Sequence, residues 1–234
     1  MWNNIENMIL YEDKEIIVCH KAAGIAVQSA RIGIPDMEST LKNYLVAKNP
    51  GKMPYLGVVH RLDQPVEGVL VFAKNKRAAA GLTGQITSGS VTKEYLAVTA
   101  QKVEKVQGHL EDYLKKDGKT NTSAVVTPET DGAKKAVLDY EVLNEVSDER
   151  ISTGKRILVR IQLGTGRHHQ IRVQMAHAGM PLLGDRKYNP SGEKGTSLGL
   201  CSSCLEFKHP RTGKMMKFET EPQGSAFLDF VKKV

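Results

Sequence analysis

The stretch from Gly57 to Lys74, GVVHRLDQPVEGVLVFAK, places one short polar turn between two apolar runs. Residues 58–59 lead into the turn and residues 69–73 lead out of it. Runs as short and apolar as these predict buried strands rather than surface helices. The polar residues of the turn are His60, Arg61 and Asp63. Because a carboxylate between buried strands is costly unless something pairs with it, Asp63 is expected in a structural ion pair or at a functional site.

A second segment, from Leu163 to Ala176, reads LGTGRHHQIRVQMA. Together the two segments resemble the RNA pseudouridine synthases of the large-subunit ribosomal RNA type, the Rlu family. That family carries an HRLD turn with the catalytic aspartate last, and later a TGR-x-HQ-[IL]-R helix start. Both patterns stand here in the same order, and the resemblance runs from about Leu10 to about Pro222.

The pattern of elements along the chain predicts many strands, several helices and no regular βαβ alternation, which is typical of an α+β protein with a largely antiparallel sheet. The resemblance implies a mixed central sheet with flanking helices, split by an RNA-binding cleft. We expect residues 1–234 to form a single pseudouridine synthase catalytic domain. The small RNA-binding domain that precedes it in many family members is expected to be missing, so that the catalytic domain selects the RNA alone.

Alternation and helical spacing predict the individual elements. The expected strands are Glu15–His20, Val91–Thr99, Ala136–Leu143, Arg156–Leu163, and a hairpin of Ser203–Phe207 with Met215–Glu219. The expected helices are Ile34–Lys48, Arg77–Thr87, and one that follows Gly166 and runs to about His177. Residues 101–132 are rich in Lys, Asp, Thr and Gly, and predict a loop-bearing excursion with short strands.

Pseudouridine formation breaks a glycosidic bond and rejoins the base through C5, without a redox change, a metal or another cofactor. The resemblance implies that Asp63 is the carboxylate that this chemistry needs, as a covalent or a stabilising partner. It implies that Arg172 keeps Asp63 ionised through a salt bridge, since burial alone favours the protonated acid. Ile171 is then the apolar residue that borders the base. Without the family pattern, a surface arginine would be the simpler interpretation of Arg172.

Lys93-Glu94-Tyr95 matches the family's K-x-Y segment, which implies that Tyr95 stacks on the flipped uracil and helps to remove the C5 proton. The alternative is an ordinary half-buried strand tyrosine. Arg61 and Arg167 are predicted to contact the nucleotide or its phosphates, and His60 to orient the turn rather than to transfer a proton. His168 and His169 are not expected to bind a metal, because adjacent histidines on a helix point in different directions.

The sequence departs from the family pattern directly after HRLD. The family commonly has Thr-Ser-Gly where this chain has Val66-Glu67-Gly68. If Glu67 faces the site, its charge raises the pKa of Asp63, and if it faces solvent it changes little. The departure bears on rate and substrate choice more than on the class of reaction.

The chain has 33 Lys and Arg against 26 Asp and Glu, a formal net charge of +7, which favours an anionic partner. Together with the resemblance, this leads us to expect RNA, ribosomal or transfer, as the partner. The sequence shows no signal pattern and no apolar run of membrane-spanning length, so we expect a cytoplasmic protein, and a monomer with no protein partner implied. Cys19, Cys201 and Cys204 are an odd set and predict no disulfide framework; a zinc site at Cys201 and Cys204 is the less favoured alternative to a structural role.

A non-catalytic RNA-binding protein on the same scaffold is the alternative function. A kinase-like H-R-D loop is excluded, because the order here is His-Arg-Leu-Asp and the sequence has neither a D-F-G nor a phosphate-binding glycine loop.

Overall fold

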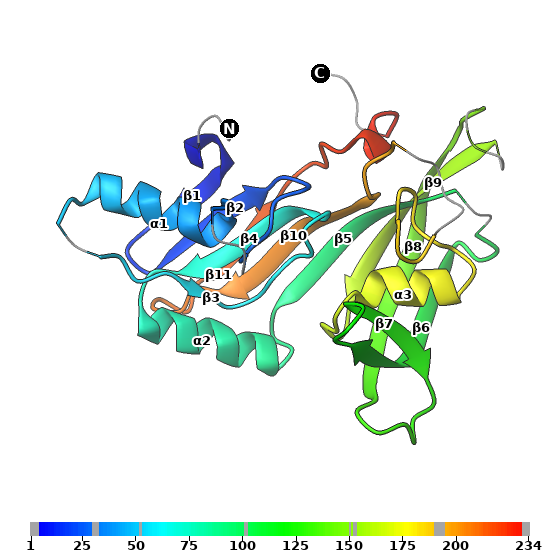
Figure 1. Ribbon diagram of the computed structural model, residues 1–234, viewed down its shortest axis with the longest axis horizontal. Helices are drawn as coiled ribbons and strands as arrows, with labels where there is room; N and C mark the ends of the chain where they lie inside the picture. The colour runs from blue at the N-terminus through cyan, green and yellow to red at the C-terminus, as the bar shows by residue number, and fades with distance from the viewer. Residues whose placement is uncertain are drawn as a thin grey trace. The chain divides into compact units, whose positions relative to one another are not determined.

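The computed structural model describes residues 5–29, 33–51, 53–100, 103–149, 151, 154–189 and 195–230. The chain forms two compact units (Figure 1). Unit 1 consists of Met1–Lys93 and Ser202–Glu221, and unit 2 of Glu94–Cys201 and Pro222–Val234. The borders fall within β5 (Thr92–Thr99) and β10 (Leu200–Lys208). The expectation of a single catalytic domain stays a prediction.

Unit 1 is built on the strand order β1-β2-β4-β10, with β3 paired to β4 and β11 paired to β10. Its elements are η1 (Ile5–Met8), β1 (Ile9–Glu12), β2 (Ile16–Lys21), α1 (Met37–Lys48), β3 (Gly57–Val58), β4 (Glu67–Ala73), α2 (Lys76–Thr87) and β11 (Met215–Glu219). β2 and β4 run antiparallel, with Ile17 opposite Phe72. The early strand, both helices and the β10–β11 hairpin that the sequence predicted are therefore confirmed.

The core of unit 1 lies on β2 and β4, in which every residue is buried. Ala78 and Leu82 of α2 pack against Val69 and Val71 in one apolar cluster. The helices begin where the sequence supplies caps: the Asp36 side chain accepts a hydrogen bond from the Ser39 N–H, and the Asn75 side chain from the Ala78 N–H. No helix of the described segments is both long and apolar enough to cross a membrane.

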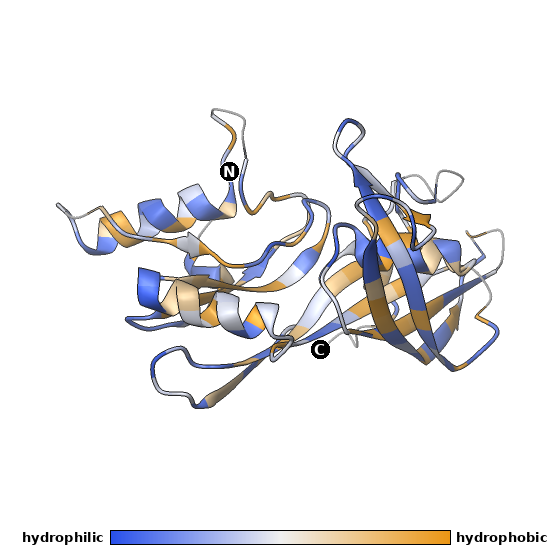
Figure 2. Ribbon diagram, turned by 90° about the horizontal axis from the view of Figure 1, so that it is seen from below, coloured by the Kyte–Doolittle hydropathy of each residue, from blue (hydrophilic) through white to orange (hydrophobic). Residues whose placement is uncertain are grey.

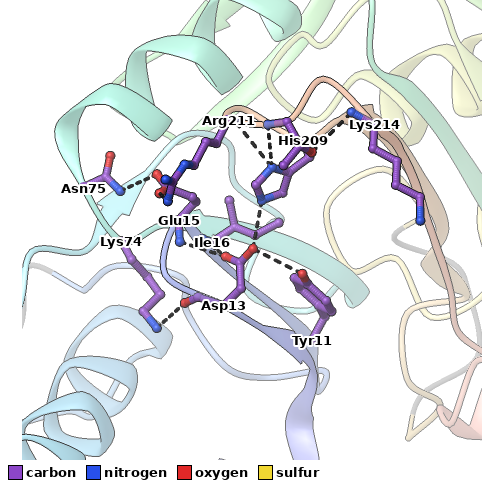
Figure 3. A network of polar contacts seen from close by, with 10 residues as sticks. Tyr11, Asp13, Glu15, Ile16, Lys74, Asn75, His209, Arg211 and Lys214 are labelled. Atoms are coloured by element: carbon purple, nitrogen blue, oxygen red, sulfur yellow. Dashed lines mark hydrogen bonds and ion pairs between the residues drawn. The ribbon is translucent and has the colours of Figure 1, made fainter.

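A polar network ties the β10–β11 hairpin to the turn between β1 and β2 (Figure 3). Asp13 accepts hydrogen bonds from the Ile16 N–H at 2.8 Å and from His209 Nε2 at 2.9 Å. His209 Nδ1 in turn accepts from the Arg211 N–H, which fixes the imidazole proton on Nε2. Arg211 also lies 3.4 Å from Glu15, so this cation of the hairpin is already engaged within the protein.

Unit 2 has the strand order β5-β9-β8-β6-β7, with every neighbouring pair antiparallel. Its further elements are β6 (Gln107–Asp117), β7 (Thr122–Val126), β8 (Lys134–Ser147), β9 (Lys155–Leu163), α3 (Gln170–His177) and η2 (Ser225–Phe227). α3 lies across these strands (Figure 1), where Val173 packs on Leu114 and Ala136. The long strands carry alternating hydrophilic and hydrophobic bands (Figure 2), as expected where one face is covered and the other is wet.

Two local predictions were wrong. The lead-in strand before the HRLD turn is only Gly57–Val58 and is half-buried. The excursion predicted for residues 101–132 contains the eleven-residue strand β6, which alternates between covered and exposed residues; residues 101 and 102 lie outside the described part. The helix predicted after Gly166 is confirmed as α3, which begins at Gln170 and ends at His177. The cysteines predicted to be structural, Cys201 and Cys204, are buried in β10 and are not joined in a disulfide.

Candidate active site

In unit 1 the HRLD turn is closed by a hydrogen bond from the Val66 N–H to the Asp63 carbonyl at 3.0 Å. The turn is fixed to the segment after β2, because the Gly24 N–H donates to the Gln64 carbonyl at 2.9 Å and the Gln64 side chain returns a bond to the Gly24 carbonyl. Asp63 is partly buried and Arg61 is exposed. The backbone that carries Asp63 is therefore held by a hydrogen bond within the turn and by two further hydrogen bonds to Gly24.

A fully buried lysine, which sequence analysis missed, lies beneath this turn. Lys21 Nζ donates to the carbonyls of Ala22, Ile25 and Gln64 at 3.1, 2.7 and 3.1 Å. Burial lowers the pKa of Lys21 to about 7, while the charges of Asp63 and Glu67 act in the opposite direction. Lys21 thus binds the turn through Gln64, and in its protonated form it lies within electrostatic reach of Asp63.

Glu67, the departure from the family pattern, does not face solvent, since it is 2% exposed. Its carboxylate Oε2 lies 3.9 Å from Nε2 of His20, whose Nδ1 is 2.8 Å from the Thr220 hydroxyl. Gly68 follows at φ +121°, where a Cβ atom would lie 2.3 Å from the Ser202 carbonyl oxygen. The glycine that the family pattern keeps is thus required by a close backbone approach.

His60 is held as a neutral ring. Its Nε2 accepts the Val71 N–H at 3.1 Å, which assigns the proton to Nδ1. Loss of hydration, and after it the charge of Lys93, lowers the pKa of His60 to about 3. A histidine in this state is poorly suited to accept a proton near neutral pH, and its expected role in orienting the turn stays a prediction.

In unit 2 the second motif forms a turn fixed to β8. The Thr165 hydroxyl accepts the Val137 N–H at 2.9 Å and donates to Gln170 Oε1 at 2.8 Å. Gln170 also accepts the Arg167 N–H at 2.9 Å and donates to the Val137 carbonyl at 2.9 Å. Arg167 is exposed, with its Nε donating to the Lys135 carbonyl at 2.8 Å. Thr165 and Gln170 of the motif are thus structural, and together they fix the backbone at Arg167, which lies between them.

The expectation that His168 and His169 point in different directions was wrong. The two rings stack with their centroids 3.8 Å apart. The reason is that both residues precede α3, and His169 takes the left-handed conformation at φ 53°. His168 Nδ1 lies 2.9 Å from the Ser123 hydroxyl. In the described segments, no group of three or more His, Cys, Asp or Glu residues is arranged to hold a metal ion.

Arg172 of α3 is 4% exposed and pairs with Asp185, a residue that sequence analysis missed. Its Nε and one terminal nitrogen donate to the two carboxylate oxygens of Asp185, both at 2.8 Å. The interpretation of Arg172 as a surface arginine is therefore wrong. Ile171 is 4% exposed. The expected salt bridge between Arg172 and Asp63 joins residues of different units and stays a prediction.

Tyr95 lies on β5, opposite Ile161 of β9, and is 8% exposed. It is thus more deeply buried than the half-buried strand tyrosine considered as its alternative. The signals for the residues that were missed are faint: Lys21 ends the apolar run IIVCHK, and Asp185 follows the turn-rich segment from Met180.

Solved structures share this fold. Human RNA Pseudouridylate Synthase Domain Containing 4 superposes with a TM-score of 0.73 at 22% identity, covering 92% of this chain and 88% of that one. Human RNA Pseudouridylate Synthase Domain Containing 1 gives a TM-score of 0.71 at 22% identity, with 92% and 82% of the two chains covered. The fold is therefore the α+β pseudouridine synthase fold that the sequence predicted, whereas the RNA-binding cleft stays a prediction.

The family described as RNA pseudouridylate synthase matches residues 15–177. An uncharacterised RNA pseudouridine synthase of Bacillus subtilis (strain 168) is 36% identical over 219 residues, which are 90% of this chain and 67% of that protein. Ribosomal large subunit pseudouridine synthase D of Pseudomonas aeruginosa is 34% identical over 233 residues, 93% of this chain and 68% of that protein. The chain belongs to the RNA pseudouridylate synthase family, and is an isomerase of that class.

Proposed function

We propose that this chain converts specific uridines of a structured RNA, ribosomal or transfer, into pseudouridine, with Asp63 as the catalytic carboxylate. The observation that carries the proposal is that the HRLD turn is fixed in place, because Lys21 and Gly24 both donate hydrogen bonds to the backbone carbonyl of Gln64. A carboxylate on so constrained a turn keeps its position while a base is broken off and rejoined. The names of the relatives support ribosomal RNA as the first substrate to test.

In the reaction the bond between C1′ and N1 breaks and a bond between C1′ and C5 forms. N1 gains a proton and C5 loses one, so the atoms of uridine are conserved. The Asp63 carboxylate serves this exchange as a nucleophile or as a stabiliser of positive charge at the ribose. Tyr95 stacks on the uracil and assists removal of the C5 proton.

The other motif residues hold Asp63 in its ionised form and position the RNA around it. Arg172 keeps Asp63 ionised by direct pairing, and its planar fork suits a carboxylate better than a lysine ammonium does. Ile171 borders the base, His60 orients the turn, and Arg61 and Arg167 contact the nucleotide or its phosphates. The exposed positions of the last two support that role. We also propose that the protein acts as a monomer in the cytoplasm.

The test is Asp63→Asn, which keeps the shape and removes the charge. Purified variant and wild type are compared for tritium release from RNA labelled at uridine C5, and we expect release by the variant to fall to background. Asp13→Asn is the matched control in unit 1, since Asp13 organises a structural network and is expected to change stability rather than turnover. A folded Asp63→Asn variant with near-normal release would contradict the assignment. RNA binding without release by the wild type would favour the non-catalytic alternative.

A further inference from the structure

The pair between Arg172 and Asp185 has the geometry of a fixed support. The Asp185 side chain has no exposed surface and that of Arg172 is 5% exposed. Because Asp185 contacts Nε and a terminal nitrogen together, the plane of the guanidinium group cannot rotate without breaking a charged hydrogen bond. An arginine has five N–H donors, so this pair engages only part of its donor capacity.

Asp185 is itself held by the backbone around it. Its Oδ1 accepts the N–H groups of Lys187 at 2.9 Å and Tyr188 at 3.2 Å. Gly184, at φ +71°, allows the chain to turn here, where a Cβ atom would lie 2.3 Å from the Ser197 carbonyl oxygen. Burial by itself raises the pKa of Asp185, but Arg172 and these two N–H groups outweigh it, so the pKa is lowered and the carboxylate is ionised at neutral pH.

Tyr188 holds the same arginine from another direction. Its ring lies 5.1 Å from the centre of the Arg172 guanidinium group, within cation–π distance. Its hydroxyl lies 2.7 Å from His169 Nδ1 and accepts the Ser123 N–H at 2.8 Å. The ring thus contacts Arg172 and, edge-on with the centroids 5.6 Å apart, His169, whereas the hydroxyl contacts His169 and the β7 strand.

We propose that Asp185 and Tyr188 are positioning residues of the isomerase, which act on the reaction by fixing the orientation of the Arg172 guanidinium group. This inference rests on the proposed role of Arg172. Asp185 fixes the plane of the group, and the Tyr188 ring restricts its movement out of that plane. Burying a charge at this position without such partners would be costly, so the cradle must form when unit 2 folds and exists before RNA arrives.

Asp185→Asn tests the role of Asp185 in fixing the plane of the guanidinium group. The single-turnover rate and the RNA dissociation constant are both measured. We expect the single-turnover rate to fall by about a hundredfold, as displacement of a catalytic group by about 1 Å does, while the RNA dissociation constant changes less than about threefold. Asp148→Asn is the matched control. Asp148 pairs with Arg156 Nε at 2.7 Å in the same unit, with side chains 6% and 3% exposed, so the variant disturbs an equally buried Arg–Asp pair away from Arg172. Its melting temperature should fall while its rate is retained.

Tyr188 separates positioning from general stability, and keeps the inference testable if Asp185→Asn does not fold. Tyr188→Phe keeps the ring and removes the hydroxyl, so we expect a lower melting temperature with the rate within about threefold of wild type. Tyr188→Leu removes the ring, and we expect a rate at least about tenfold below that of Tyr188→Phe at a similar melting temperature. Equal rates for Tyr188→Phe and Tyr188→Leu, or equal losses for Asp185→Asn and Asp148→Asn, would overturn the inference. Retained activity of Asp63→Asn would instead overturn the proposed function.

Discussion

Two buried basic side chains, Lys21 beneath the first motif and Arg172 in the second, bind partners within their own unit. Lys21 donates to three carbonyl groups, and Arg172 donates to both oxygens of Asp185. Because a buried charge without partners is costly, these contacts must be present in the folded protein before substrate binds. The local field at each motif is thus set in advance, which is how enzymes obtain large electrostatic effects without reorganisation during the reaction.

Lys21→Met tests this at a single residue through the pH dependence of stability. The native pKa of Lys21, about 7, lies below its ordinary value of 10.5. Between these values the unfolded chain binds a proton that the native chain does not, so the wild type gains stability as pH rises, by at most about 1.4 kcal/mol per pH unit. Below about pH 7 both states are protonated and this gain is absent. Methionine keeps the length of the side chain and does not titrate.

We therefore expect the difference in unfolding free energy between wild type and Lys21→Met to increase from pH 7 to pH 9, as measured by urea denaturation. Other groups titrate alike in both proteins and cancel in the difference. A difference that stays constant with pH would show that Lys21 keeps an ordinary pKa in the native state. The variant should be less stable at both pH values, because three buried carbonyls lose their donor.

The motifs predicted which residues to examine, but not their partners. Asp63 and Arg172 were found because short patterns surround them. Asp185 was missed because a hydrogen-bonded pair forms between two segments whose contact depends on the turn at Gly184, and no local pattern specifies that contact. Lys21 was missed because a lysine at the end of an apolar run is usually exposed, whereas here three carbonyl groups surround it.

At the scale of elements, continuous or alternating apolar residues predicted strands well, and a strand without that pattern was missed. β4 and β9 were found, because continuous or alternating apolar residues mark them. β6 was missed, because only Leu114 among its last residues is buried and the others are charged. A strand whose one face packs on a single helix needs few apolar residues, and its composition then resembles that of a loop.

The turn before α3 offers a test at this scale. Thr165→Val removes the hydroxyl that accepts the Val137 N–H and donates to Gln170, with little change in volume. The Val137 N–H then loses its acceptor, and we expect a loss of about 1–3 kcal/mol in unfolding free energy. Thr165→Ser keeps the hydroxyl and should lose much less. A larger loss for Thr165→Ser than for Thr165→Val would indicate that the methyl group, rather than the hydrogen bonds, fixes this turn.

At the scale of the whole molecule, not every lysine and arginine that contributes to the positive net charge is available to bind a phosphate. Many exposed lysines and arginines lie in ion pairs within the protein. Examples are the pairs Lys42–Glu38, Lys155–Glu145, Arg211–Glu15 and Lys217–Glu219. The formal net charge of +7 favours RNA in general, but the count of cations overstates how many can neutralise a phosphate.

RNA affinity should therefore depend on salt through particular residues rather than through net charge. Each phosphate neutralised contributes about −0.7 to the slope of log K against log salt for single strands. Arg167→Gln, at a proposed phosphate contact, should make the slope shallower by about that amount. Lys217→Gln is the matched control: it lowers the net charge by the same single unit, but removes a side chain that lies 2.8 Å from Glu219. We expect its slope to match that of the wild type in binding titrations from dilute to physiological salt. Equal changes in the two variants would show that the slope responds to net charge alone. An unchanged slope for Arg167→Gln would show that Arg167 does not contact a phosphate, because an arginine that neutralises a phosphate cannot be lost without releasing fewer counterions.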